Sequence, residues 1–278
     1  MNKKAQYTIV AGLIGAWTLL TFWTALAQDT PAPSVTVTLE KNTITQHEPV
    51  IMRFTFLNPS SQDIAVDLGY DFEEVDVKVT DTDGRVWRRP HLTAREVRER
   101  ISQGLFVPPG SILTFPAVIY AAPGATGVTS IVLNDWVDFD KVGIYRITVA
   151  PSPLSTSSPG SVQIKEASLM LTVVPRDEVS LATACAGLIT RLMDWKSAED
   201  SETAANALSK VNDPVAVPFL AQALKQKSFA TMMVAALARL NTPDAVIALE
   251  SASRSSDKET RDAARNALTV LHKTRPLG

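Results

Sequence analysis

Histidines and carboxylates are the residues of this 278-residue chain that could support catalysis or bind a metal. The three histidines, His47, His91 and His272, stand far apart, and none belongs to a metal-binding or nucleophile motif. Glu48 follows His47, but the second histidine of a zinc-protease helix is missing. No catalytic triad is supported, so we expect a protein that is not an enzyme and has no cofactor.

Two acidic clusters, Asp81–Gly84 and Asp135–Asp140, could instead supply oxygen ligands to calcium. The first lacks the third ligand and the distal glutamate of a calcium loop, and Asp-Gly is itself a turn signal. We therefore predict turns here and no metal site.

Cys185 is the only cysteine, so no intramolecular disulfide is possible. It lies in the apolar run Leu181–Ile189, where a thiol usually behaves as a small hydrophobic side chain. We predict a core position rather than a nucleophile.

Trp87, Arg88, Arg89 and Trp136 are the best candidates for a protein-binding surface, because tryptophan and arginine dominate the energetics of interfaces. The alternative is that both tryptophans alternate into a core while the arginines face solvent.

The elements that would position these residues fall into two parts, and the first is a predicted antiparallel β-sandwich over residues 28–176. Apolar and polar residues alternate with the strand period of two in the runs Val35–Leu39, Ile51–Leu57, Val75–Val79, Ile144–Val149 and Leu169–Val174. Turn signals separate these runs at Asn58–Ser61, Asp81–Gly84, Pro108–Gly110 and Ala122–Gly124. Thr93–Ile101 predicts one short helix between strands.

A family resemblance is carried by Glu48–Val50 leading into Phe54–Asn58, then by Asp83–Trp87, Val107–Gly110 and Val142–Ile147. These segments resemble bacterial immunoglobulin-like (Ig-like) sandwiches, in particular the intracellular-proteinase-inhibitor type. The resemblance implies an Ig-like fold for about half the chain. It also implies an alternative function, inhibition of a protease through a loop such as Gly104–Gly110.

The second part, residues 177–275, is predicted to be a short α-helical solenoid of about three helical hairpins. Ala207–Pro214 recurs as Ala236–Pro243, 29 residues later. Asn212–Asp213 and Asn241–Thr242 can end one helix and cap the next, with a proline in the following first turn. The pattern resembles HEAT-type repeats, with alanine pairs that allow close helix approach.

The first residues read as a targeting segment. A positive start, Met1–Lys4, precedes an apolar stretch that ends in Ala25–Ala27 and is followed by polar residues. We predict a signal peptide over residues 1–27, cleaved after Ala27. An uncleaved membrane anchor is the alternative, because Tyr7–Ala27 is long enough to span a bilayer. Both place the rest of the chain outside the cytoplasm.

Charge divides between the two parts. Residues 28–178 hold 13 basic and 19 acidic side chains, a net charge of −6, whereas residues 179–278 hold 12 and 10, a net charge of +2. The opposite signs could favour docking of the parts. No dense basic field suited to nucleic acid is present. We expect a periplasmic or secreted envelope protein that binds a protein partner of unknown identity, with contact to a membrane only if the first segment is uncleaved.

Overall fold

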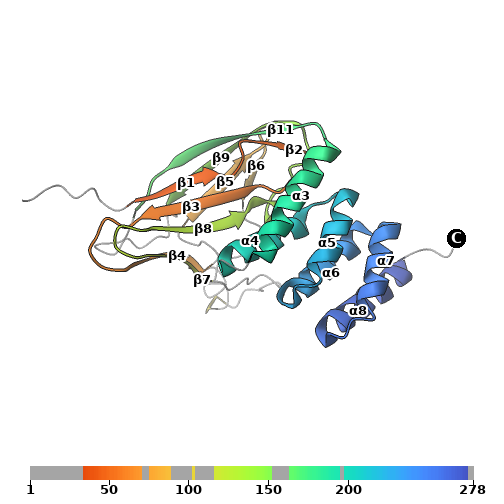
Figure 1. Ribbon diagram of the computed structural model, residues 1–278. Helices are drawn as coiled ribbons and strands as arrows, with labels where there is room; N and C mark the ends of the chain where they lie inside the picture. The colour runs from red at the N-terminus through yellow and green to blue at the C-terminus, as the bar shows by residue number, and fades with distance from the viewer. Residues whose placement is uncertain are drawn as a thin grey trace, which may run out of the picture.

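The computed structural model describes residues 34–70, 75–88, 102–103, 116–151, 163–194 and 197–274. Strands occupy the N-terminal part of these residues and helices the C-terminal part, which confirms the predicted order of a β part followed by an α part. Figure 1 shows the sheets at one end of the molecule and the helices stacked away from them towards the C-terminus. We call residues 34–174 the β-sheet region and residues 178–274 the helical region.

The β-sheet region contains all five of the predicted strands and six further described strands. Three of these six, Ile64–Tyr70, Pro116–Ala121 and Thr126–Val132, are full-length strands that the alternation did not predict. Its described strands are β1 (Ser34–Leu39), β2 (Thr43–Thr45), β3 (Ile51–Leu57), β4 (Ile64–Tyr70), β5 (Val75–Thr80), β6 (Val86–Arg88), β7 (Pro116–Ala121), β8 (Thr126–Val132), β9 (Gly143–Pro151), β10 (Gln163–Ile164) and β11 (Ala167–Val174).

These strands form a sheet in the order β10-β1-β3-β8, a second sheet in the order β2-β11-β9-β5-β6, and a separate pair of β4 with β7. Most neighbours are antiparallel, as predicted, but β1 with β10 and β2 with β11 are parallel. The chain passes from β1 to β2 through only Glu40–Asn42 and changes sheet there. As a result β2 joins the second sheet beside β11 instead of forming a hairpin with β1.

The two larger sheets share one hydrophobic core, because the period-two alternation directs every second side chain inward. Phe54 and Phe56 enter it from β3, Tyr145 and Ile147 from β9, and Leu171 from β11, and each is at most 1% exposed. Full burial of such a side chain contributes about 1.5–3 kcal/mol.

The predicted turn at Asp81–Gly84 is confirmed between β5 and β6. One Asp81 carboxylate oxygen accepts the backbone N–H groups of Asp83 and Arg85, each at 2.9 Å. Gly84 has a φ of 78°, a left-handed conformation that favours glycine.

The described helices of the helical region are α3 (Glu178–Met193), α4 (Ala198–Lys210), α5 (Val217–Ala223), α6 (Ala230–Leu240), α7 (Pro243–Ala252) and α8 (Lys258–Thr274). Short 3-10 turns are η1 (Leu133–Asp135) in the β-sheet region, and η2 (Pro214–Ala216) and η3 (Lys227–Phe229) in the helical region.

The predicted caps are confirmed. Asp213 accepts a hydrogen bond from the Val215 N–H, and Thr242 accepts one from the Ala245 N–H. Pro214 and Pro243 occupy the first turns that follow. The helices α3, α5 and α7 contact one another in order, as do α4, α6 and α8.

Cys185 is confirmed as a core residue, since it is fully buried in the hydrophobic cluster of the helices. Burial raises the pKa of its thiol to about 12, which disfavours the nucleophilic thiolate.

The predicted targeting segment and the predicted helix Thr93–Ile101 lie outside the described residues. Within the described part of the chain, no helix has both the length and the apolar character needed to cross a membrane.

Candidate functional site at the junction of strands and helices

The β-sheet region and the helical region are joined by apolar packing. Ile51 of β3 and Val132 of β8 are buried in the hydrophobic cluster of the helices rather than in the core between the sheets. The helix α4 packs on β8 and on η1. In Figure 1, α3 and α4 lie next to the sheets and α7 and α8 lie farthest from them.

The linker between β11 and α3 is fixed by the loop that follows β2. The Thr45 hydroxyl donates to the Pro175 carbonyl at 3.0 Å and accepts from the Asp177 N–H at 2.7 Å. The Gln46 side-chain carbonyl accepts from the Arg176 N–H at 2.9 Å. The linker is therefore a defined connection and not a free tether.

Arg176 and Asp213 tie this linker to the start of η2. The guanidinium Nε donates to Oδ2 at 2.5 Å and Nη2 donates to Oδ1 at 3.1 Å. Burial alone would raise the pKa of Asp213, but the hydrogen bonds from Arg176 and from the Val215 N–H outweigh burial and lower the pKa. The pair is thus charged on both sides at neutral pH.

Arg191 of α3 links the helical region to Glu40, the residue after β1. Its Nη1 lies 3.0 Å from a Glu40 oxygen, while Arg53 of β3 contacts the other oxygen at 2.7 Å. Arg191 Nη2 also donates to Asp200 of α4 at 2.6 Å. Burial alone would lower the pKa of Arg191, but these carboxylates raise it.

Asp135 of η1 makes the third link. It pairs with Lys210 of α4 and accepts from the Asn206 side-chain amide at 3.0 Å. In the Glu40 and Asp135 links the carboxylate belongs to the β-sheet region and the cation to the helical region, in keeping with the charge asymmetry in the sequence.

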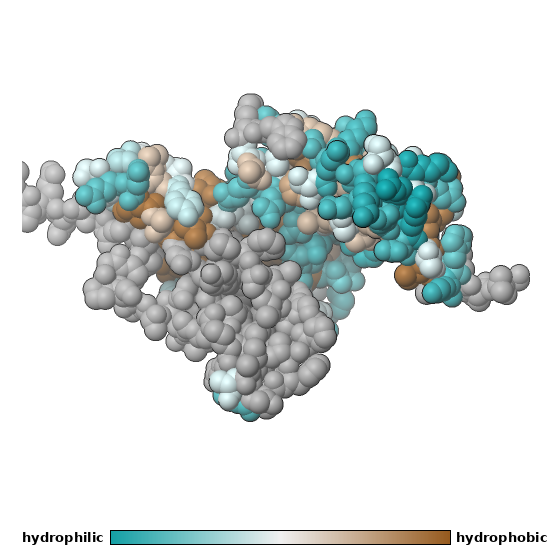
Figure 2. All heavy atoms as spheres, turned by 90° about the horizontal axis from the view of Figure 1, so that it is seen from below, coloured by the Kyte–Doolittle hydropathy of each residue, from teal (hydrophilic) through white to brown (hydrophobic). Residues whose placement is uncertain are grey.

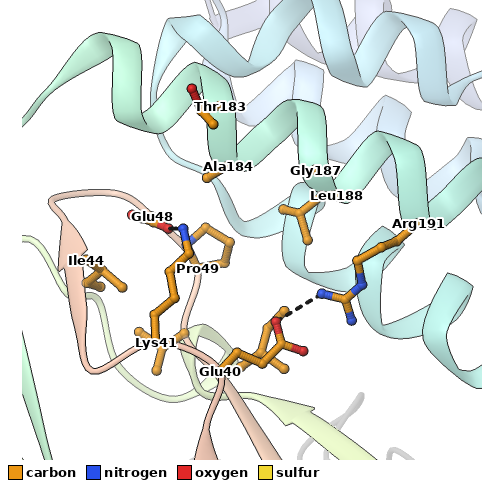
Figure 3. A pocket seen from close by; sticks show the side chains of 12 residues that line it. Glu40, Lys41, Ile44, Glu48, Pro49, Thr183, Ala184, Gly187, Leu188 and Arg191 are labelled. Atoms are coloured by element: carbon orange, nitrogen blue, oxygen red, sulfur yellow. Dashed lines mark hydrogen bonds and ion pairs between the residues drawn. The ribbon is translucent and has the colours of Figure 1, made fainter.

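A cleft of about 190 Å³ lies between α3 and the segment that runs from the end of β1 into β3. Figure 3 shows Ile44 and Pro49 facing Leu188 across it. At Gly187 an added Cβ would meet no heavy atom within 4 Å, so the missing side chain leaves space on this wall.

The carboxylates of the cleft are already engaged. Figure 3 shows Lys41 reaching Glu48, and Arg191 reaching Glu40 from the opposite wall. Glu48 also accepts the Thr45 N–H at 3.1 Å. Both carboxylates are therefore committed to ion pairs within the protein.

The structure places two of the predicted binding residues, Trp87 and Arg88, on β6 and a third, Trp136, directly after η1. Trp87 in β6 and Trp136 after η1 are both partly buried against the core of the sheets. The Trp87 indole N–H donates to Asp81 at 3.3 Å, and the Arg85 guanidinium lies 3.9 Å from the centre of its ring. Arg88 is the last residue of β6. Arg89, like the predicted inhibitory loop Gly104–Gly110, lies outside the described residues.

Within the described ranges, no group of three His, Cys, Asp or Glu residues could hold a metal ion. In the second acidic cluster, Asp135 pairs with Lys210, while Asp138 and Asp140 are exposed.

The residues of the junction cannot be predicted from the sequence alone. Arg191 and Glu40 are 151 residues apart, so no local spacing relates them. The sequence predicts Asp213 as a helix cap, but no pattern in the sequence predicts its burial against Arg176.

The model of the PBS lyase HEAT-like repeat family matches residues 202–226, from within α4 through α5. The predicted HEAT-like repeats are thus confirmed in this part of the chain. Comparison with curated protein sequences gives no match.

Several solved structures resemble the chain weakly. They include the CARDB domain of a Pyrococcus furiosus protein in complex with two metal ions (12% identity, 52% of this chain and 90% of that chain, TM-score 0.28). A β-glucosidase from Erythrobacter marinus has 12% identity over 51% of this chain and 16% of its own, with a TM-score of 0.27. Astrotactin-2, a vertebrate perforin-like membrane protein, has 14% identity over 84% and 38%, with a TM-score of 0.24. All three TM-scores lie below 0.5, so the similarities establish neither a shared fold nor a shared function.

Proposed function

We propose that this protein is an exported, non-enzymatic binding or scaffold protein of the bacterial cell envelope, which holds a protein partner through its helical repeats and its β-sheet region. Export rests on the predicted signal peptide, residues 1–27, with an uncleaved anchor as the alternative. The protein acts in the periplasm or outside the cell.

We further infer that the β-sheet region is an Ig-like sandwich. The order β1-β3-β8 opposite β11-β9-β5 corresponds to the two sheets of that fold. Tyr145, early in β9, donates its hydroxyl hydrogen to the Lys141 carbonyl at 3.0 Å, as the tyrosine corner of Ig-like domains does.

The helical region is, on this proposal, a short solenoid. Its two rows of helices, α3-α5-α7 and α4-α6-α8, suit the stacked hairpins of such proteins. Figure 2 views the molecule from below, and on this face the helical region is mainly hydrophilic with small hydrophobic areas. A solenoid surface of this kind is suited to contact with another protein.

The main support for the proposal is the junction, where the β-sheet region and the helical region are held in one arrangement. Arg176, Arg191 and Lys210 each make an ion pair there, and Ile51 and Val132 pack under the helices. A flexible pair of domains would lose orientational entropy when both parts bind one partner, whereas a preorganised pair does not. The junction therefore supports a role as one continuous binding surface.

The test compares two triple variants of the full chain as bait for envelope proteins. One replaces the junction cations Arg176, Arg191 and Lys210 with alanine. The control replaces three exposed cations elsewhere with alanine, namely Lys225, Arg254 and Lys258. Both variants lose three positive charges, but only the first loosens the junction.

We expect the junction variant to retain less than about a tenth of the captured partner, because several kcal/mol of preorganisation are lost, while the control binds as wild type does. Small-angle scattering should show a larger maximum dimension for the junction variant alone. Absence of any captured protein with wild type, or equal capture by both variants, contradicts the proposal. Sequencing the mature N-terminus from fractionated cells tests export, for which Gln28 is the expected first residue.

A further inference from the structure

The outer face of the sheet β2-β11-β9-β5-β6 points away from the core. The strand registers place its outward residues in rows that run across the strands, and we call each row of residues in register a rung. One rung is Val86, Thr80, Arg146 and Met170, and the next is Ile144, Thr172 and Thr43. On the other side of the first rung, Lys78 and Thr148 lie in register with Ser168.

Large apolar side chains occupy outward positions of this face. Val86 is 52% exposed, Ile144 57% and Met170 47%. An antiparallel sheet with one solvated face normally carries polar residues at such positions. Ile144 and Met170 are diagonal neighbours on the adjacent strands β9 and β11, whereas Val86 lies three strands away from Met170. The adjoining pair is more than the scattered single residues of an ordinary surface.

The charge on this face is positive, although the β-sheet region as a whole is acidic. Arg146 is exposed at the centre of the first rung, and no described residue forms an ion pair with it. Lys78 pairs with Asp76 at 2.8 Å. The described positions of the three rungs hold no carboxylate. Arginine and methionine are enriched in protein interfaces, whereas aspartate and glutamate are depleted, so the composition fits a docking surface.

We propose that the outer face around Ile144, Arg146 and Met170 binds a partner protein whose contact surface presents a carboxylate to Arg146, surrounded by apolar side chains. The proposal rests on the proposed function and names the surface and the chemistry of the partner.

A second copy of this chain fits the outer face poorly, because a two-fold interface would bring Arg146 close to its own equivalent. A membrane surface fits it poorly too. Each basic side chain near an anionic bilayer contributes about 1 kcal/mol, and here Lys78 is neutralised by Asp76. A protein surface that combines a carboxylate with apolar side chains can pair with Arg146 and also cover its apolar neighbours.

The test uses photocrosslinking of the full chain in its own cells. Thr172, which lies in register with Ile144, is replaced by p-benzoylphenylalanine, and a second strain carries it instead at Ile247 of α7, which is 62% exposed. Arg146→Glu is then combined with each probe, and Arg254→Glu serves as the matched reversal of an exposed cation on the helical region.

We expect a discrete protein adduct at Thr172 that falls at least tenfold with Arg146→Glu, since arginine is a common hot-spot residue, and that persists with Arg254→Glu. Changing a partner carboxylate close to the crosslinked residue to lysine should restore the adduct with Arg146→Glu. An adduct to lipid, to a second copy of the chain, or to a protein unaffected by Arg146→Glu overturns the inference. An adduct at Ile247 without one at Thr172 overturns it and leaves the proposed function standing, whereas no adduct at either position counts against both.

Discussion

Substitutions can distinguish the stability that comes from the ion pair between Arg176 and Asp213 from the stability that comes from helix capping. The next repeat serves as the control, because it has an equivalent cap without an ion pair. Asp213 caps η2 and also pairs with Arg176. Thr242, the equivalent residue 29 positions later, caps α7 through Ala245 and makes no ion pair. We therefore compare Asp213→Ala with Thr242→Ala, and both with Asp213→Asn.

The expected magnitudes follow from burial. Breaking a buried ion pair costs about 3–5 kcal/mol. Asp213 is 3% exposed, but the Arg176 side chain is 41% exposed and keeps a second partner, Glu178, at 3.6 Å. We therefore expect loss of this ion pair to cost about 2 kcal/mol of unfolding free energy, which is below that range. Loss of a cap adds about 1 kcal/mol. Asp213→Ala should therefore cost about 3 kcal/mol, Asp213→Asn about 2 kcal/mol and Thr242→Ala about 1 kcal/mol.

The stability that the Asp213 ion pair contributes should decrease as pH falls. The pKa of Asp213 is lowered in the folded protein, chiefly by Arg176 and the Val215 N–H acting against burial, with a smaller contribution from His47. A lowered carboxyl pKa contributes stability that is fully present above the pKa of the unfolded chain, about 4, and is lost as pH falls towards the folded value. The difference between wild type and Asp213→Asn should therefore be constant near pH 7 and shrink below about pH 4.

Urea unfolding followed by circular dichroism measures these free energies of unfolding. Thermal midpoints should fall by about 6–12 °C for Asp213→Ala and about 2–4 °C for Thr242→Ala. Equal losses for the two alanine variants would refute the claim that the ion pair contributes beyond the cap. A difference that persists unchanged to pH 2 would refute the role of the charge.

Three other side chains give direct tests. Cys185 should not react with a disulfide reagent in the folded protein and should react stoichiometrically in denaturant, because burial raises its thiol pKa to about 12. Tyr145→Phe should cost about 1 kcal/mol in urea unfolding, through loss of the hydrogen bond to the Lys141 carbonyl; an unchanged midpoint would contradict this. Glu199 is an exposed residue, but partial desolvation where α4 packs on β8, the largest influence, raises its pKa despite its hydrogen bond from Thr129. Ionisation therefore costs a small amount of stability, reduced by solvent screening, as pH rises through the unfolded value. Glu199→Gln should be at least as stable as wild type at pH 7 and lose any advantage below about pH 4.

The sequence predicted what depends on local pattern and missed what depends on partners distant in the chain. Alternation located β3 and β9, and the caps of η2 and α7 followed from Asp213 and Thr242 with their prolines. The parallel pairing of β2 could not be predicted, because alternation fixes which face of a strand is buried and not which neighbour it meets. Trp87 shows the same limit of prediction from local pattern. Its pattern allowed either an interface or the core, and only the register of β6 with β5 turns it towards the core.

The change of pattern at residue 176 marks a change of secondary structure but does not make the two parts independent. The strand β8 is at the edge of its sheet, where unpaired backbone groups invite association with other strands. The helix α4 packs on β8, and Glu199 accepts a hydrogen bond from the Ser130 backbone. Ile51 and Val132 are only 5% and 2% exposed because helices cover them.

A fragment of residues 28–176 should therefore expose an apolar patch and an open strand edge, and we expect it to elute as oligomers or aggregates in size-exclusion chromatography. The same fragment with Ile51→Thr and Val132→Thr keeps the β-branched shape and removes much of the exposed apolar surface, so it should be more soluble. A monomeric, stable wild-type fragment would show that the helices are not needed to protect this edge. In the full chain the same two substitutions should be destabilising, because the threonine hydroxyls would then be buried among the helices.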